Sequence, residues 1–399
     1  MPLRVLNLSW EYPPVIEGGL ARHVRKLSEA LVAGQDVEVH VITRAGASTA
    51  PREDRHGVIV HRVETPPFPL QTDRFLDWVA GMNDGFLARG RELCEQLGFD
   101  VVHGHDWLVA DASHRLAAIA DAPFVATIHA TEHGRHQGAV TESPRSQIHA
   151  IERWMAHRAD HLIVCSHYMR DHVSAIFALD PARIEVIPNG IDAADLRPVS
   201  DLPALRARFA APSERLILLI GRLVYEKGFQ DALDALGGAG GLIDRLGNVR
   251  FVIAGSGNHE PELRARAAAL GLDAHGSFLG WAGDDLLHSL YRVADLTVVP
   301  SIYEPFGLVA LEAMASGCAC IVADTGGLRE VVPASAAAFR FASGDSVALG
   351  RAMERVLTEP VLRDQLVADA AAHVQSFDWD DVAARTAAAY GAVRVTAST

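Results

Sequence analysis

The chain has 399 residues, of which 49% are hydrophobic and 22% are charged, and its formal net charge at pH 7 is −14. This length exceeds what one hydrophobic core usually serves, so two domains of about 200 residues are expected. The negative charge argues against nucleic acid as a partner and against strong membrane association, and no apolar run approaches the length of a membrane span.

The cysteines and the first residues bear on the compartment. Cys94, Cys165, Cys318 and Cys320 are too few and too scattered for a disulfide framework or an all-cysteine zinc site. We interpret them as reduced and mostly buried thiols. The residues after Met1 enter a strand pattern without a charged and then apolar leader, so we expect no signal peptide and a cytoplasmic location.

Strands and helices alternate along the first half of the sequence. A first strand over residues 4–9 leads through the glycine pair Gly18-Gly19 into an amphipathic helix from residue 20 to about 32. Further strands are predicted at 37–43, 57–63, 100–105, 124–129, 161–165 and 184–187, and helices at 73–97 and 166–176. This alternation is typical of a doubly wound α/β domain.

A second domain repeats the plan after a turn at residues 188–192. The segment up to residue 212 contains prolines, alanines and charges without a strand pattern, which indicates a domain junction. We assign 1–195 to the N-terminal domain, 196–212 to a linker, 213–378 to the C-terminal domain and 379–399 to a final helix. Strands of the second domain are predicted at 216–220, 249–254, 276–279, 296–299 and 319–322.

The most informative stretch is 301–317, a loop that leads from a buried strand into a helix. Glu304 and Glu312 lie eight residues apart, just over two helical turns, so both side chains can face one cleft from different depths. Pro305 and Gly307 expose backbone N–H groups at the helix start, where the helix dipole favours a phosphate or sugar oxygen. The alternative interpretation is two surface glutamates that flank a helix N-terminus.

With its Pro-Phe-Gly-Leu core and the Gly-Gly pair at 326–327, this stretch resembles the E-x7-E signature of retaining GT-B glycosyltransferases, the large family that includes bacterial glycogen synthases. The resemblance implies two Rossmann-like domains that face each other across a cleft, with the acceptor on the N-terminal side and the nucleotide sugar on the C-terminal side. It also implies that the final helix crosses back to the first domain. Glu304 would lie at the donor hexose and Glu312 at the nucleotide ribose. Further donor contacts would come from Phe306, Gly307 and Leu308.

A second motif, Gly221 to Gly228, directly follows a predicted strand and resembles the diphosphate-binding motif of the same family. Arg222 offers a planar fork and Lys227 a point charge, so together they can neutralise a leaving nucleotide diphosphate without a metal. A surface salt bridge with Glu226 is the alternative. By resemblance, Gly18-Gly19 also lies against the donor diphosphate, although the pair lacks the GxGxxG spacing of dinucleotide enzymes.

Histidines end two predicted strands of the first domain. By resemblance, His129 contacts a hydroxyl of the donor sugar, or its backbone carbonyl supports the oxocarbenium-like transition state; a purely structural histidine is the alternative. His105 and Asp106, within His-Gly-His-Asp-Trp, look like the acceptor-side cluster of glycogen-synthase-type enzymes. Asp106 is also explained by a helix N-cap.

Two patterns that suggest a metal are rejected. Residues 129–133 match the H-x-x-E-H pattern of a zinc peptidase, but that chemistry needs both histidines on one helical face, and His129 ends a strand. Residues 378–380 match the D-x-D pattern of metal-dependent transferases, but an N-cap aspartate explains them. We therefore expect no catalytic metal and no cofactor.

The resemblance therefore implies a metal-independent, retaining hexosyltransferase of the kind found in polysaccharide biosynthesis, similar to actinobacterial α-glucosyltransferases. It would move a hexose, with UDP- or ADP-glucose as the favoured donor, to a soluble oligo- or polysaccharide and form an α-glycosidic bond, with α-1,4 as the favoured linkage. A GDP-mannose-dependent α-mannosyltransferase is the main alternative, and a nucleotide-sugar 2-epimerase is a more distant one. A dinucleotide-dependent oxidoreductase would need a GxGxxG motif after a strand of the first domain, which is absent. A nucleotide-sugar sensor without catalysis would bind the donor but show no turnover. The sequence leaves open whether the protein forms a homo-oligomer.

Overall fold

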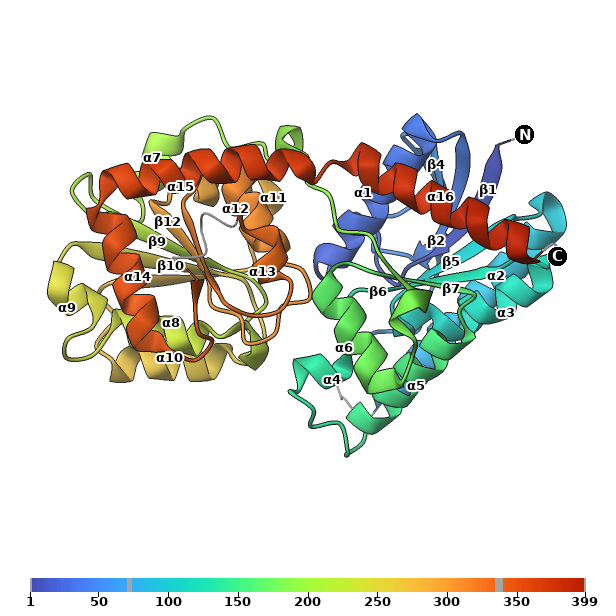
Figure 1. The fold of residues 1–399 in the computed structure, drawn as a ribbon, viewed down its shortest axis with the longest axis horizontal. Helices are drawn as coiled ribbons and strands as arrows, with labels where there is room; N and C mark the ends of the chain where they lie inside the picture. The colour runs from blue at the N-terminus through green and yellow to red at the C-terminus, as the bar shows by residue number, and fades with distance from the viewer. Residues whose placement is uncertain (1, 70–73, 334–339, 398–399) are drawn as a thin grey trace. The chain divides into compact units, whose positions relative to one another are not determined.

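The computed structural model describes residues 2–69, 74–333 and 340–397. The chain divides into two compact units: unit 1 comprises Met1–Gly190 and Asp378–Thr399, and unit 2 comprises Ile191–Phe377. Figure 1 shows that each unit consists of a sheet with helices packed around it. Within the described residues, none of the helices is long and apolar enough to span a membrane.

Unit 1 is built on an eight-stranded sheet with the order β3-β4-β2-β1-β5-β6-β7-β8. Its strands are β1 (Leu3–Leu8), β2 (Val37–Arg44), β3 (Arg52–Arg55), β4 (Val58–Val63), β5 (Val101–His105), β6 (Phe124–Ile128), β7 (His161–Val164) and β8 (Ile184–Val186). All neighbours are parallel except β3 and β4. The prediction missed β3, because its four charged residues carry no apolar pattern and pair only at the sheet edge.

The helices of unit 1 follow its strands. They are α1 (Gly19–Gly34), α2 (Phe75–Leu97), α3 (Ala110–Ala120), α4 (Glu132–Arg135), α5 (Arg145–Arg158), α6 (His167–Phe177) and α16 (Trp379–Ala397). The predicted start of the long helix at residue 73 lies outside the described residues.

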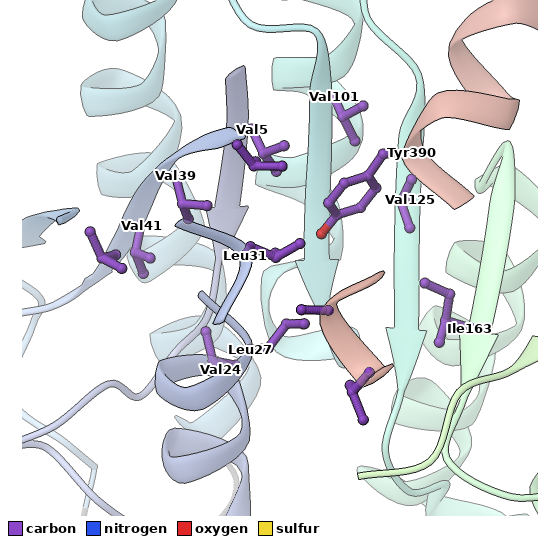
Figure 2. Close-up of a cluster of buried hydrophobic side chains, with 14 of the residues drawn as sticks. Val5, Val24, Leu27, Leu31, Val39, Val41, Val101, Val125, Ile163 and Tyr390 are labelled. Atoms are coloured by element: carbon purple, nitrogen blue, oxygen red, sulfur yellow. The ribbon is translucent and has the colours of Figure 1, made fainter. Parts of the chain in front are cut away.

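A single core cluster joins the sheet of unit 1 to α1 and α16. In Figure 2, valines of β1, β2, β5 and β6 converge with Val24, Leu27 and Leu31 of α1. Tyr390 of α16 is fully buried in this cluster, and its hydroxyl lies 2.7 Å from His103 Nδ1. The last helix of the chain is therefore a packed part of unit 1.

Unit 2 is built on a six-stranded, fully parallel sheet with the order β11-β10-β9-β12-β13-β14. Its strands are β9 (Arg215–Ile220), β10 (Val249–Ala254), β11 (Gly276–Gly280), β12 (Leu296–Val299), β13 (Cys320–Ala323) and β14 (Arg340–Phe341). Its helices are α7 (Leu202–Ala207), α8 (Phe229–Leu236), α9 (Leu242–Leu246), α10 (Glu260–Ala269), α11 (Asp284–Val293), α12 (Leu308–Ala315), α13 (Leu328–Val331), α14 (Ser346–Thr358) and α15 (Pro360–His373).

The segment 196–212, predicted as a linker, is instead part of unit 2. It contains α7, and Leu205 and Ala210 lie in the same core cluster as Leu216 of β9. The N–H of Val199 also donates to Ser289 Oγ at 2.7 Å. The helix has only six residues, too few to show an apolar period in a sequence rich in proline and alanine.

Candidate active site

The strand order of each sheet reverses at one point. In unit 1, β1 lies between β2 and β5, and in unit 2, β9 lies between β10 and β12. Doubly wound sheets bind ligands outside the carboxyl ends of the strands at this switch point. Eight predicted site residues lie at the end of the strands that flank it or in the loops that follow them: Gly18, Gly19, His105 and Asp106 in unit 1, and Gly221, Arg222, Lys227 and Glu304 in unit 2.

An ion pair links the two motif loops of unit 2. Lys227 Nζ lies 2.7 Å from Glu304 Oε2, which also accepts a hydrogen bond from Ser301 Oγ at 3.0 Å. The Lys227 and Glu304 side chains are only 19% and 10% exposed. Lys227 is one of two lysines in a chain with 34 arginines. The compact ammonium provides a partly buried point charge here without the wide fork of a guanidinium.

Backbone contacts fix the distance between these two loops. The N–H groups of Ile302 and Tyr303 donate to the Glu226 carbonyl at 2.8 and 3.2 Å. Gly228 has a φ of +69°, and a Cβ at this position would lie 1.9 Å from the carbonyl oxygen of Pro300. Only glycine permits this approach, so the backbone itself sets the position of Lys227.

The second predicted cation, Arg222, is more exposed than Lys227. It follows Gly221 at the end of β9, its side chain is 49% exposed, and its Nη2 lies 3.6 Å from Glu226 Oε1. An exposed pair at this distance contributes little stability. The alternative interpretation, a surface salt bridge with Glu226, therefore describes Arg222 in this structure. It does not describe Lys227, which pairs with Glu304 instead.

Helix α12 carries the second glutamate of the motif. Gly307 precedes Leu308 at the helix start with a φ of +118°, and Phe306 packs edge-on against Phe377 with ring centroids 6.0 Å apart. Glu312 is 7% exposed, and its Oε2 accepts a hydrogen bond from the hydroxyl of Tyr291 at 2.8 Å.

Tyr291 belongs to α11 and is fully buried. Sequence reasoning missed this residue, because a tyrosine on the apolar face of a helix has the pattern of an ordinary core residue. The downstream Gly-Gly pair also contacts the motif, since the Gly327 N–H donates to the Glu304 carbonyl at 2.8 Å.

Four histidines gather at the switch point of unit 1. His105 Nδ1 lies 3.2 Å from His129 Nε2, so the structure brings these two predicted residues into direct contact. His23 of α1 packs against both rings, with centroids 4.6 Å from His129 and 5.7 Å from His105. The ring of His103 packs against that of His105, with ring centroids 4.1 Å apart. The prediction missed His23 and His103, because each follows the apolar pattern of its helix or strand.

Burial keeps these rings uncharged. It lowers the pKa of His23, His103 and His105 well below the ordinary value, and neighbouring histidines lower each further. Burial alone lowers the pKa of His129 to about 3. At neutral pH the cluster therefore consists of neutral imidazoles, which can donate and accept hydrogen bonds without adding charge.

Asp106 holds the backbone that carries His129. Its Oδ1 accepts the His129 N–H at 2.7 Å, and its own N–H donates to the Thr127 carbonyl at 2.9 Å. Its φ of +63° is uncommon for a residue other than glycine, and such conformations cluster at functional sites. Residues Trp107–Val109 form a short 3-10 helix, and the Asp106 side chain makes no capping hydrogen bond to it. The alternative that Asp106 serves as a helix N-cap is therefore removed. Burial raises the pKa of Asp106 to about 6.

The glycine loop of unit 1 already binds a carboxylate of the chain. Glu11 Oε2 accepts the N–H groups of Glu17 and, at 3.1 Å, Gly18. One donor expected to face a diphosphate is therefore engaged within unit 1, while Gly19 is exposed as the first residue of α1. Burial raises the pKa of Glu11 to about 7.

The patterns rejected as metal motifs do not form such sites. His129 follows β6, whereas His133 lies on α4, whose N-cap Thr131 accepts the Gly134 N–H at 3.0 Å. The two histidines are therefore not on one helical face. At the other pattern, Asp378 Oδ1 accepts the Asp380 N–H at 3.2 Å where α16 begins, as expected for a capping aspartate.

Known proteins resemble both units. A family model of group 1 glycosyl transferases matches residues 203–373, and a model of glycosyltransferase family 4 matches residues 17–195. The chain is 39% identical over 410 residues to a glycogen synthase of Mycobacterium tuberculosis, covering 98% of this chain and 95% of that protein. It is 31% identical to a D-inositol 3-phosphate glycosyltransferase of Actinosynnema mirum, covering 94% and 93% of the two chains.

Solved structures share the architecture. Sucrose-phosphate synthase from Thermosynechococcus elongatus matches with a TM-score of 0.83 and 23% identity, over 99% of this chain and 100% of that one. The Anabaena protein HepE in complex with UDP-glucose matches with a TM-score of 0.77 and 21% identity, over 98% and 100% of the two chains. The predicted family and the predicted GT-B fold are confirmed. The chain therefore belongs to glycosyltransferase family 4, a family of retaining hexosyltransferases.

Proposed function

We propose that the protein transfers glucose from UDP- or ADP-glucose to a soluble oligo- or polysaccharide, with retention of configuration, and forms an α-1,4 bond. The observation that carries this proposal is the Lys227–Glu304 ion pair at the switch point of unit 2. The 39% identity to a protein named glycogen synthase supports glucose and an α-glucan acceptor over the mannosyltransferase and epimerase alternatives.

The cations of unit 2 suit a nucleotide diphosphate. Negative charge grows on the leaving diphosphate as the glycosidic bond breaks, so fixed positive charges stabilise the transition state more than the bound substrate. Lys227 is held in place by Glu304, and Arg222 can present its fork to the same anion. The two residues supply the charge without a metal.

The neutral histidines of unit 1 suit the opposite charge. An oxocarbenium-like transition state carries positive charge on the sugar, and a protonated imidazole beside it would raise the barrier by repulsion. Burial keeps His129 neutral, and Asp106 orders the backbone on which it lies. We assign His129 to the donor sugar and His105 to the acceptor side, with Asp106 as a positioning residue.

A donor panel tests the reaction itself. Purified protein is incubated with UDP-glucose, ADP-glucose or GDP-mannose, with and without malto-oligosaccharides, and released nucleotide is measured. We expect acceptor-dependent release with a glucose donor and an α-anomeric proton in the NMR spectrum of the product. Preference for GDP-mannose would establish the mannosyltransferase alternative, nucleotide release with an epimerised sugar and no acceptor would establish the epimerase, and a β-linked product would contradict retention.

The two lysines allow a direct test of the donor site. An amine-selective reagent is applied with and without UDP or ADP, and labelling is quantified by peptide mass spectrometry. We expect the nucleotide to protect Lys227 while labelling of Lys26, on α1 of unit 1, stays unchanged as an internal control. Equal labelling of Lys227 with and without nucleotide would contradict its assignment to the diphosphate.

A further inference from the structure

We propose that His23, His105 and His129 form a binding site for a divalent transition-metal ion of the zinc class, and that the bound ion inhibits sugar transfer. One nitrogen from each ring can be chosen so that all three lie within 4.8 Å of one another. The three residues come from α1, from the end of β5 and from the residue after β6, so only the folded unit brings them together.

The distances suit a small ion. Zinc–nitrogen bonds of 2.0–2.1 Å place two ligands of a tetrahedron roughly 3.3–3.4 Å apart. His105 Nδ1 and His129 Nε2 already lie 3.2 Å apart. Ring rotation must bring the third nitrogen closer by at most about 1.4 Å, a shift that side chains make on binding without backbone movement.

One nitrogen in each of two of these rings lacks the hydrogen-bond partner that a buried polar atom normally has. Within the described residues, neither His23 Nδ1 nor His105 Nε2 has a partner. The large majority of buried side-chain polar atoms in proteins have a hydrogen-bond partner, so each buried nitrogen without one calls for an explanation. An ion bound by His23 Nδ1 would give that atom a partner, whereas His105 Nε2 is the nitrogen left over when His105 binds through Nδ1.

The surroundings favour a transition metal with an open coordination position. The set contains imidazoles, which suit zinc, copper and nickel, and no carboxylate, which magnesium and calcium prefer. The carboxylate of Asp106 accepts the backbone N–H of His129 and so fixes the main chain that carries this ligand. His129 is partly exposed whereas His23 and His105 are buried, so an ion can enter beside His129 and keep one position for water.

The consequence for activity rests on the proposed function. If His129 acts at the donor sugar, an ion on its ring places positive charge beside the oxocarbenium-like transition state. This repulsion slows transfer. Zinc would therefore act as a reversible inhibitor, and a metal-free enzyme would be the active form.

Direct metal binding tests the site independently of activity. Full-length protein is dialysed against a chelator, and Zn²⁺ is titrated in competition with a chromogenic chelator; Co²⁺ is used in parallel because its visible spectrum reports coordination. We expect one tight ion per chain, and His23→Gln should weaken it more than about 100-fold, since loss of an outer-shell partner alone costs 10–100-fold. His23→Cys restores a ligand and should recover most of the affinity.

A matched control separates this site from generic histidine binding. His288 of unit 2 is buried, and its Nδ1 also lacks a partner within the described residues, so His288→Gln should leave zinc affinity unchanged. Circular dichroism verifies that each variant is folded. The proposal is overturned if the wild type binds no tight ion, or if His23→Gln and His288→Gln bind zinc equally. Tight binding without inhibition would uphold the metal site and count against the role of His129.

Discussion

Fifteen of the nineteen histidines lie in unit 1 and four in unit 2, although both units place their site residues at the switch point of a doubly wound sheet. The rings at the switch point of unit 1 are buried or, at His129, partly buried, and they are neutral. At the same point unit 2 carries Lys227 and Glu304 as an ion pair. The same kind of switch point therefore carries charged side chains in unit 2 and uncharged rings in unit 1.

The difference shows how a site follows from side chains placed on a common backbone plan. A leaving diphosphate needs fixed positive charge, whereas a sugar that becomes cationic needs polar groups that stay neutral. Under the proposed function, Lys227, held in position by Glu304, and Arg222 would meet the first need in unit 2. The histidines of unit 1 would meet the second, because burial makes their protonation unfavourable.

The largest expected effect tests the charge in unit 2. Lys227→Ala should lower kcat/KM by about 100- to 1,000-fold, or about 2.7–4 kcal/mol, as found when a transition-state donor is removed. Lys227→Arg should recover part of this loss, because it keeps the charge but not the compact shape. Steady-state kinetics with Lys26→Ala as the control measure the effect. A Lys227→Ala enzyme with wild-type kcat/KM would contradict the diphosphate assignment.

A smaller effect is expected at the second glutamate of unit 2. If Glu312 binds the ribose, Glu312→Gln should raise the donor KM by a factor equivalent to about 1–3 kcal/mol, the cost of leaving a hydrogen-bond partner unsatisfied, with little change in kcat. Tyr291→Phe should raise the donor KM by a factor equivalent to about 1 kcal/mol, because Glu312 then loses the hydrogen bond from the tyrosine hydroxyl. Initial rates at varied donor concentration give both values. An unchanged donor KM in Glu312→Gln would remove the ribose role.

An effect of similar size is expected on folding stability in acid, where unit 1 should lose more stability than unit 2. Burial and the neighbouring His40 and Arg89 lower the pKa of His61 to about 3. A base with a lowered pKa stabilises the fold fully above its unfolded value of about 6.5, and this contribution is lost as the pH falls toward 3. Between pH 6.5 and about pH 5 the loss is at most roughly 2 kcal/mol for this histidine.

Hydrogen exchange resolved by peptide and corrected for the intrinsic rate measures this loss. Protection of β2 and β4 should fall over this pH range, while peptides of unit 2 serve as an internal reference. His61→Gln should flatten the pH dependence of unit 1. Equal losses in the two units would show that the histidines do not set the acid sensitivity.

The smallest expected effect concerns metal removal. If Arg222 and Lys227 supply the positive charge, as proposed, excess EDTA should leave kcat unchanged, or raise it slightly if zinc occupies the histidine site. Rates before and after chelation, with Mg²⁺ and Mn²⁺ added back, decide this. Loss of activity that Mg²⁺ or Mn²⁺ restores would mean that the cations of unit 2 are not sufficient.

Local patterns were enough to predict much of the fold and the two motif loops. Strands such as β9 and β12 are continuous apolar runs, and the glycines of the loops that follow them mark close backbone approaches, both of which are visible over a few residues. The six-residue α7 and the charged edge strand β3 were missed, because neither is long or apolar enough to show a period.

The sequence by itself determined the α/β alternation, the family, and the loops that carry Lys227, Glu304, His105 and His129. Only the tertiary structure decided which of these side chains meet. Lys227 contacts a glutamate 77 positions away, and His105 contacts a histidine 24 positions away, beside His23 of α1. Such contacts depend on strand order and on helix packing over the sheet. No local pattern encodes these, because they arise only when distant apolar faces are buried together.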